Sequence, residues 1–275
     1  MLPSFKQLDY LGQKWNAQAD RPIVEMEFYH RAHLLAELAF ICYWNEKYVR
    51  EVCEHIGFEV TDFLDFEGAQ AYVIRNENDT VVACRGTEAN DWNDIRADLK
   101  VWKVVAETVG KVHGGFKDEV DHLWPALEVA LRENENPLHF TGHSLGGAMA
   151  QICAGRCQLS EIDSEPAEVQ TFGSPRVGNK RYITHYDIRK IRWVNNNDFV
   201  TRFPPALFGY RHTGLEMYID GDGNISGLTG LRRISDGISS FFKGIVRARF
   251  DHFADHLMPG YVLALLNAAK DEGDS

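Results

Sequence analysis

Ser144 lies in the pattern Gly-His-Ser-Leu-Gly at residues 142–146, within the stretch LHFTGHSLGGAMAQICAGR. This stretch opens with a short apolar run that is typical of a strand and continues into small and apolar residues that predict a helix. A serine between glycines on such a turn matches the nucleophile elbow, because the strand and helix approach too closely for large flanking side chains. The helix N-terminus would also favour a developing oxyanion. The pattern therefore predicts a nucleophilic serine.

A nucleophilic serine needs a histidine to take its proton and a carboxylate to orient that histidine. In elbow enzymes the acid follows the serine in the chain and the histidine comes last. Asp198 ends an apolar run in WVNNNDFVTRFPP and is the candidate acid, whereas most other acids lie on helical faces that are expected to be exposed. Near the C-terminus, DHFADH offers two candidate bases, His252 and His256. The N–H of Leu145, directly after the serine, is the expected oxyanion donor.

Metal and cofactor sites are not expected. The two histidines are four residues apart, but Phe253 stands where the zinc motif H-E-x-x-H has its glutamate. The stretch DGDGN at residues 220–224 resembles a calcium loop, yet Ile225 stands where that loop needs glycine, so a hairpin turn is predicted instead.

The elements that must position these side chains alternate along the chain. Strand-like runs occur at 71–74, 81–84 and 138–141, and in AEVQTFGSPRVGN and DIRKIRWVNNNDFV; helical spacing occurs at 31–56, in one or two pieces, and at 116–133. Such alternation predicts an α/β fold with a mostly parallel central sheet covered by helices on both faces. We expect a single domain over 1–275, with an N-terminal helical region at 1–66 and an insert near 214–250.

The composition limits the partners and the compartment. With 44% hydrophobic and 25% charged residues, the 275-residue chain is expected to fold as a globular protein. Its 29 Lys and Arg against 40 Asp and Glu give a net charge of −11, which disfavours a nucleic-acid partner. No apolar run is long enough for a transmembrane segment, and the N-terminal stretch lacks a signal-peptide pattern. The sequence does not indicate an oligomeric state.

The cysteines do not form the pattern of a disulfide framework. They are few, odd in number and scattered, at Cys42, Cys53, Cys84, Cys153 and Cys157. This usage favours a reducing compartment, so a cytoplasmic location is favoured over secretion after removal of a leader. Cys153 and Cys157, one helical turn apart, are expected to be core residues.

An ordered series of motifs resembles the class 3 (fungal-type) triacylglycerol lipase family of the α/β-hydrolase superfamily. The series extends over about residues 68–265 and comprises VVACRGTEANDWNDIRADL, VHGGF, FTGHSLGGAMA, TFGSPRVGN, NNNDFVTRFPP and DHLMPGYVLAL. The resemblance implies Ser144 as nucleophile, Asp198 as acid and His256 as base. It favours His256 over His252 because the base of the family is followed by a tyrosine and then a leucine, matched here by Tyr261 and Leu263.

The resemblance also implies the rest of an oxyanion hole. Thr87, after "RG", would donate alongside Leu145, and Asp98 in "RADL" is the candidate support for the Thr87 hydroxyl. Residues 88–97 take the place of the family's lid. No cofactor is implied.

The implied function is a serine carboxylic-ester hydrolase that acts on acylglycerols through an acyl-enzyme. The alternatives are a phospholipase, a short-chain or feruloyl-type esterase of the same family, and a non-catalytic hydrolase-like binding protein. The expected partner is a lipid or other ester, met at a lipid–water interface through residues 231–250. That segment interleaves five basic residues and one acid with apolar ones, typical either of a lipid-docking amphipathic helix or of a surface helix packed on the domain.

Overall fold

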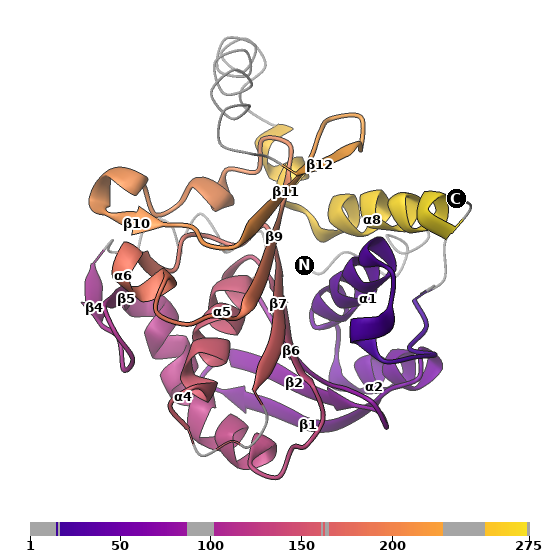
Figure 1. The fold of residues 1–275 in the computed structure, drawn as a ribbon, viewed down its shortest axis with the longest axis horizontal. Coiled ribbons are helices and arrows are strands. Elements are labelled where there is room, and N and C mark those ends of the chain that lie inside the picture. Colours follow the sequence, from indigo (N-terminus) through magenta and orange to yellow (C-terminus); the bar gives the residue numbers. More distant parts are fainter. Residues whose placement is uncertain are drawn as a thin grey trace.

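A central sheet of eight strands organises the protein (Figure 1). The computed structural model describes residues 15, 17–86, 102–160, 162, 165–227 and 251–273. The sheet has the order β1-β2-β3-β6-β7-β9-β11-β12. Its strands are β1 (Glu59–Phe66), β2 (Ala69–Arg75), β3 (Thr80–Cys84), β6 (Leu138–His143), β7 (Pro166–Phe172), β9 (Arg189–Asn195), β11 (Leu215–Ile219) and β12 (Ile225–Gly227). The strands from β3 to β11 are parallel, and β1, β2 and β12 pair antiparallel at the edges, so the predicted mostly parallel sheet is confirmed.

Helices cover both faces of this sheet, as predicted (Figure 1). One face packs against α1 (Phe28–Ile41), α2 (Glu46–His55) and α8 (Met258–Gly273), and the other against α4 (Gly114–Leu131) and α5 (Leu145–Cys157). The alternation along β2 shows why two layers form. Tyr72 and Ile74 belong to the first core, whereas Ala71 and Val73 belong to the second, because successive strand residues point to opposite faces.

A second, smaller sheet lies beside the central one, at the left of Figure 1. It has the order β10-β8-β5-β4 and is flanked by the short helix α6. The bounds are β4 (Lys103–Val105), β5 (Lys111–His113), β8 (Gly178–Asn179), α6 (Lys180–Ile183) and β10 (Tyr210–Arg211). We did not predict this sheet, because strands of two or three residues are too short for a period of two to be recognised.

Several predicted elements are confirmed. The helical stretch at 31–56 forms two helices, and the Asn45 side chain caps the second by accepting from the Tyr48 N–H at 3.1 Å. The runs at 71–74 and 81–84 lie in adjacent strands joined by a turn. The DGDGN stretch is the turn between β11 and β12, where Asp220 Oδ1 accepts from the N–H groups of Asp222 and Asn224, each at 2.9 Å.

Two predicted boundaries differ from the structure. The N-terminal helical region was expected to reach residue 66, but the helices end at His55 and β1 follows. The sequence of β1 hides the strand because it is acidic, lies at a sheet edge and has a bulge between Val60 and Asp62. The insert was expected from residue 214, but β11 belongs to the central sheet as a parallel neighbour of β9. Residues 228–250, including the basic segment at 231–250, lie outside the described residues.

All five cysteines are free and buried. Cys153 and Cys157 pack in the core between α5 and the sheet, as predicted. Burial raises the pKa of the Cys157 thiol well above its ordinary value, which keeps the thiol protonated and unreactive. None of the helices in the described ranges is both long and apolar enough to cross a membrane.

Candidate active site

Ser144 occupies a strained turn between β6 and α5. Its φ of 58° and ψ of −127° are unusual for a residue with a side chain, and such strain is found mainly at functional positions. The neighbouring glycines make the turn possible. A Cβ on Gly142 would overlap the backbone of Gly146, and a Cβ on Gly146 would overlap the carbonyl of Cys84. The close approach expected of a nucleophile elbow is therefore present in the backbone.

Three side chains that are far apart in the sequence form one hydrogen-bonded line at this turn. His256 Nε2 lies 2.9 Å from Ser144 Oγ, and His256 Nδ1 lies 2.9 and 3.0 Å from the two carboxylate oxygens of Asp198. All three residues are buried. A neutral imidazole that donates from Nδ1 to the carboxylate presents Nε2 as the acceptor for the serine proton, which is the arrangement a general base requires. The side chain of the other candidate base, His252, lies outside the described residues.

The sheet explains why these residues meet. Ser144 follows the carboxyl end of β6, Asp198 follows that of β9, and these ends lie on the same edge of the sheet with β7 between them. Gly173 follows β7 and faces the site. Its φ of 59° and the space around it exclude a side chain, because a Cβ there would lie 2.6 Å from Asp198 Oδ2 and 3.0 Å from His256 Nδ1. The glycine in the motif TFGSPRVGN thus leaves room for the histidine–aspartate pair.

Asp198 is held by two further donors. The Tyr261 hydroxyl donates to Asp198 Oδ2 at 2.6 Å, and the Val200 N–H donates to Oδ1 at 2.9 Å. The Asn195 N–H in turn donates to the Tyr261 oxygen at 3.1 Å. Burial and the adjacent Asp198 carboxylate raise the pKa of Tyr261 well above its ordinary value, so the phenol keeps its proton and remains a donor. These contacts fix the orientation of the carboxylate.

A second histidine, His143, contacts the main chain of His256. His143 Nε2 lies 2.7 Å from the backbone carbonyl of His256, and His143 Nδ1 lies 2.8 Å from the Tyr43 hydroxyl. Burial holds the pKa of His143 well below its ordinary value, so its ring is neutral. Because a carbonyl can only accept, Nε2 carries the proton and Nδ1 accepts from Tyr43. This contact could not be predicted from the sequence, because Tyr43 is 100 residues away from His143 and no motif contains both.

The described residues contain only part of the expected oxyanion hole. Leu145 is the first residue of α5, where an N–H has no acceptor within the helix and can serve a ligand. Gly86, at the end of the segment after β3, passes directly beside the elbow, since a Cβ there would lie 3.3 Å from Ser144 Cβ. Thr87, Asp98 and the lid position at 88–97 lie outside the described residues.

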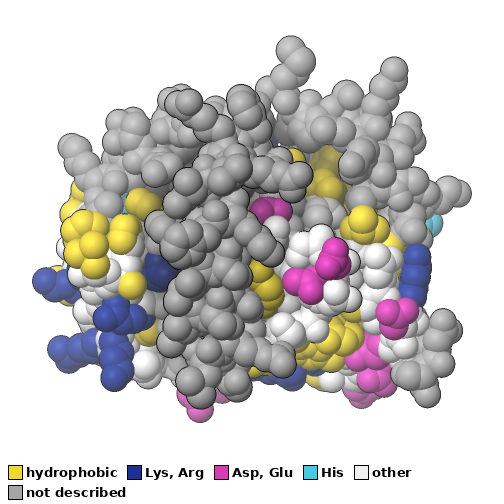
Figure 2. Space-filling view, turned by 90° about the horizontal axis from the view of Figure 1, so that it is seen from above, with side chains coloured by type: hydrophobic (Ala, Val, Ile, Leu, Met, Phe, Trp, Pro, Cys, Tyr) yellow, Lys and Arg dark blue, Asp and Glu magenta, His cyan; other side chains and the backbone are white. Residues whose placement is uncertain are grey.

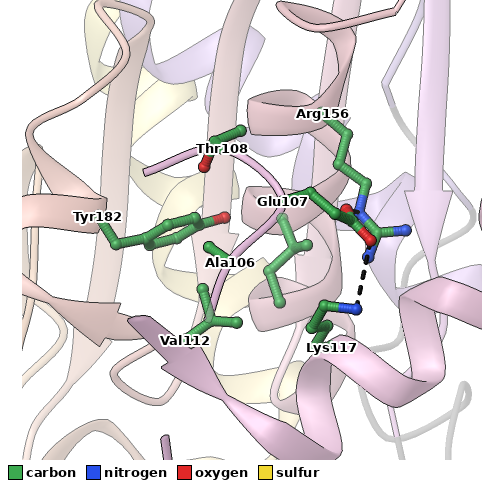
Figure 3. A pocket seen from close by; sticks show the side chains of 8 residues that line it. Ala106, Glu107, Thr108, Val112, Lys117, Arg156 and Tyr182 are labelled. Carbon is green, nitrogen blue, oxygen red and sulfur yellow. Dashed lines mark ion pairs between the residues drawn. The ribbon is translucent and has the colours of Figure 1, made fainter. Parts of the chain in front are cut away.

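A small pocket lies elsewhere, beneath the hairpin of β4 and β5 (Figure 3). It is lined by Ala106, Glu107, Thr108, Val112, Lys117, Ile152, Arg156 and Tyr182. Its volume of about 10 Å³ holds about one water molecule. Its charges pair with one another: Glu107 lies 2.5 Å from Arg156 Nε and 3.2 Å from Lys117 Nζ. The pocket is too small for an ester substrate and does not include Ser144. No group of His, Cys, Asp and Glu within the described ranges could hold a metal ion.

Residues 81–208, which include the elbow and Asp198, match the family model described as lipase (class 3). Over these residues the chain is similar to the class 3 lipase family. Among its curated relatives is the secreted mono- and diacylglycerol lipase 1 of Fusarium solani, 33% identical over 166 residues, which are 56% of this chain and 48% of the relative. A lipase of Rhizomucor miehei is 36% identical over 119 residues, 40% of this chain and 33% of the relative. The chain thus matches about half, or less, of the length of these two relatives.

Solved structures agree with the family in fold. A fungal lipase–inhibitor complex, described as a model for interfacial activation, superimposes with a TM-score of 0.63 at 26% identity over 72% of this chain and 83% of that one. The Rhizomucor miehei triacylglyceride lipase has a TM-score of 0.63 at 21% identity over 93% and 94%. The fold of this chain is therefore the α/β-hydrolase fold. The family match ends at residue 208, so the placement of His256 rests on the geometry of this protein itself.

Proposed function

We propose that this protein is a serine carboxylic-ester hydrolase that acts on acylglycerols, with Ser144 as nucleophile, His256 as base and Asp198 as acid. The observation that carries the proposal is the buried hydrogen-bonded line from Ser144 Oγ through the His256 ring to the Asp198 carboxylate. Acylglycerols are the proposed substrates because relatives that match this chain are named as mono- and diacylglycerol lipases.

The geometry suits a two-step mechanism. His256 Nε2 takes the proton of Ser144 as Oγ attacks the ester carbonyl, and the negative oxygen is stabilised by the N–H of Leu145 together with Thr87. His256 then gives its proton to the leaving alcohol as the carbon–oxygen bond breaks, which leaves an acyl-enzyme. A water molecule, deprotonated by the same imidazole, attacks the acyl carbon. The bond from that carbon to Ser144 Oγ then breaks, the imidazole returns the proton to Oγ, and the acid is released. Asp98 is the proposed support of the Thr87 hydroxyl.

Asp198 serves this cycle by stabilising the imidazolium that forms at each step. Tyr261 and the Val200 N–H hold both of its oxygens in place, so the carboxylate does not have to reorganise as charge develops on His256. No step needs a cofactor or metal, since each proton moves between groups that this chain or the substrate provides.

Secretion is the proposed location. The relatives matched here include proteins named as secreted, whereas the cysteine pattern favoured the cytoplasm. All five thiols are buried, and a buried thiol resists oxidation in either compartment. The cysteine pattern is therefore compatible with secretion.

The decisive experiment compares wild type with Ser144→Ala on p-nitrophenyl esters from acetate to palmitate and on emulsified triolein. We expect the variant to lose about 10⁴ to 10⁶-fold in kcat, because the nucleophile is removed while the binding groups remain. Its circular dichroism spectrum should match that of wild type. Turnover that survives the substitution would disprove the mechanism.

Two further comparisons test the base and the substrate class. His256→Ala should be as damaging as Ser144→Ala, whereas His252→Ala should retain turnover; the reverse result would transfer the role of base to His252. Hydrolysis of triolein and long-chain esters would support an acylglycerol lipase. Activity confined to short soluble esters would favour the short-chain esterase alternative.

A further inference from the structure

The small sheet and its flanking loops concentrate positive charge in an otherwise acidic protein. We define the small-sheet face as residues 102–113, 174–186 and 199–212, the segments that contain β4, β5, β8, α6 and β10. Its seven basic residues are Lys103, Lys111, Arg176, Lys180, Arg181, Arg202 and Arg211. Its one acid is Glu107. The whole chain has a net charge of −11, so this face differs in sign from the rest of the molecule.

Most of this charge is available to a partner. Lys111, Lys180, Arg181, Arg202 and Arg211 are exposed. Within the described ranges none of these five forms an ion pair with a carboxylate, and Glu107 is already paired with Arg156 and Lys117. The positive charge is therefore not neutralised internally.

Large apolar side chains are exposed on the same face. Leu207 is 82% exposed and Val105 72%, and Phe208 and Trp102 are close to half exposed. Contacts between the segments bring these groups together: Lys103 Nζ donates to the Phe208 carbonyl at 2.5 Å, and the Tyr210 hydroxyl donates to the Trp102 carbonyl at 3.2 Å.

Figure 2 shows this combination from above. At its left side, where Figure 1 has the small sheet, a yellow apolar patch adjoins dark blue basic side chains with no magenta acid between them. One of its segments, 199–212, begins directly after Asp198 of the candidate active site.

We propose that the small-sheet face docks the enzyme on lipid surfaces that carry negative charge. Lys and Arg side chains attract anionic headgroups, and Leu207 and Phe208 enter the boundary between headgroups and acyl chains. Docking would bring Ser144 to an aggregated substrate, and in this respect the proposal rests on the proposed lipase function. A nucleic acid fits less well, because exposed aliphatic side chains gain nothing from a phosphate backbone. The residues that define this face do not include the basic segment at 231–250.

The first test measures binding to vesicles in a Ser144→Ala background, so that no lipid is consumed. We expect the protein to sediment with phosphatidylcholine vesicles that contain about 30 mol % phosphatidylglycerol, to bind pure phosphatidylcholine much more weakly, and to be released by about 1 M salt. Equal binding to both kinds of vesicle would overturn the proposal.

Charge reversal locates the surface. One basic residue near a membrane contributes about fivefold to partitioning, so Arg181→Glu with Arg202→Glu should weaken binding to the anionic vesicles by at least about 25-fold. The matched control is Lys47→Glu with Arg132→Glu, which changes the net charge equally on exposed positions of α2 and the end of α4. Equal losses in the two double variants would show a general charge effect and refute the small-sheet face. A loss obtained only by altering 231–250 would also refute it.

The apolar contribution has its own matched pair. Leu207→Ser should weaken vesicle binding by about tenfold, whereas Val129→Ser, which alters another exposed apolar side chain on α4, should not. On soluble p-nitrophenyl acetate, the small-sheet variants made with Ser144 intact should keep wild-type rates. Vesicle binding without any ester turnover would leave docking standing and reject the proposed function. Ester turnover without preferential binding to anionic vesicles would reject the docking proposal and leave the proposed function standing.

Discussion

At the scale of single residues, the support of His256 extends beyond its carboxylate. Tyr43 donates to His143, and His143 donates to the backbone carbonyl of His256. A partly buried tyrosine just after the C-terminal end of α1 thus helps to fix the main chain that carries the base. The ring centroids of His143 and His256 are 4.5 Å apart. A shift of either ring would therefore be transmitted to the other.

The Tyr43→Phe substitution tests this support. It leaves His143 Nδ1 without the hydroxyl donor, and we expect a loss of about 1–3 kcal/mol in the free energy of unfolding. We also expect kcat for soluble esters to fall about tenfold with little change in KM, because the base loses alignment and no substrate contact is removed.

A matched control separates alignment from stability. Tyr186→Phe removes a buried hydroxyl that is remote from Ser144 and donates to the Gln151 carbonyl at 3.0 Å. It should cost similar stability and leave kcat unchanged. A comparable kcat loss in both variants would mean that Tyr43 acts only through global stability.

The residues that carry the proposed chemistry were accessible from sequence to different degrees. Ser144 could be predicted because the elbow is a local motif that needs glycines at fixed spacing, and Asp198 because it ends an apolar run in the right chain order. Choosing His256 over His252 needed a family resemblance, since two histidines four residues apart are locally equivalent. Tyr43 could not be found, because its contact with His143 exists only once α1 packs on the sheet.

At the scale of elements, the elbow depends on β6, α5 and the end of β3 meeting with no side chain between them. Gly146→Ala would force a Cβ into the carbonyl of Cys84 and the backbone at Gly86, where rigid strand and turn atoms cannot move aside. We expect a loss of about 3 kcal/mol or more in the free energy of unfolding, measured by urea denaturation, with an equally severe loss of activity.

The control for this prediction is Gly227→Ala at the end of β12. Within the described residues its nearest neighbour would be Met217 Sδ at 3.9 Å, an ordinary contact, so stability should change by less than about 1 kcal/mol. Similar destabilisation at the two positions would show that the cost of Gly146→Ala does not come from crowding by the added Cβ.

Helices and strands could be predicted where they were long enough for their apolar periodicity to be recognised. The central strands β2, β3 and β6 and the helices α1, α2 and α4 follow from apolar spacing. The strand β1 was missed because its exposed edge is acidic and bulged, and β11 was assigned to an insert because its pairing with β9 is a long-range property. The small sheet was missed because its strands are recognised only by their pairing with one another, and the sequence of each strand is too short to show a period of two.

At the scale of the whole molecule, composition conceals how charge is arranged. The net charge of the chain is −11, yet three segments separated by up to about a hundred residues bring seven basic residues into the small sheet and its flanking loops. No single segment is basic enough to indicate this. The asymmetry follows from the topology of the small sheet, which joins β4 and β5 to β8 and β10.

The same scale governs the response of stability to pH. His113 is 1% exposed, its ring stacks on Phe116 with centroids 4.1 Å apart, and within the described residues neither ring nitrogen has a hydrogen-bond partner. Burial lowers the pKa of His113 from 6.5 to about 4. Burial also holds the pKa of His143 below its ordinary value, so both rings are neutral in the folded protein at pH 7.

These shifts fix the sign of the pH dependence. The unfolded chain binds a proton at each of these two histidines more readily than the folded chain does, so acid favours unfolding. The contribution of the neutral, buried rings to the free energy of unfolding is fully present above about pH 6.5 and is lost as the pH falls towards about 4. For His113 the loss is at most about 3 kcal/mol. We expect the urea midpoint to fall across this window, and His113→Leu to flatten the decline while His185→Leu, at an exposed position, leaves it unchanged. If wild type and His113→Leu lost stability in parallel between pH 6.5 and 4, the acid sensitivity would have to reside in other groups, with His143 the next to replace.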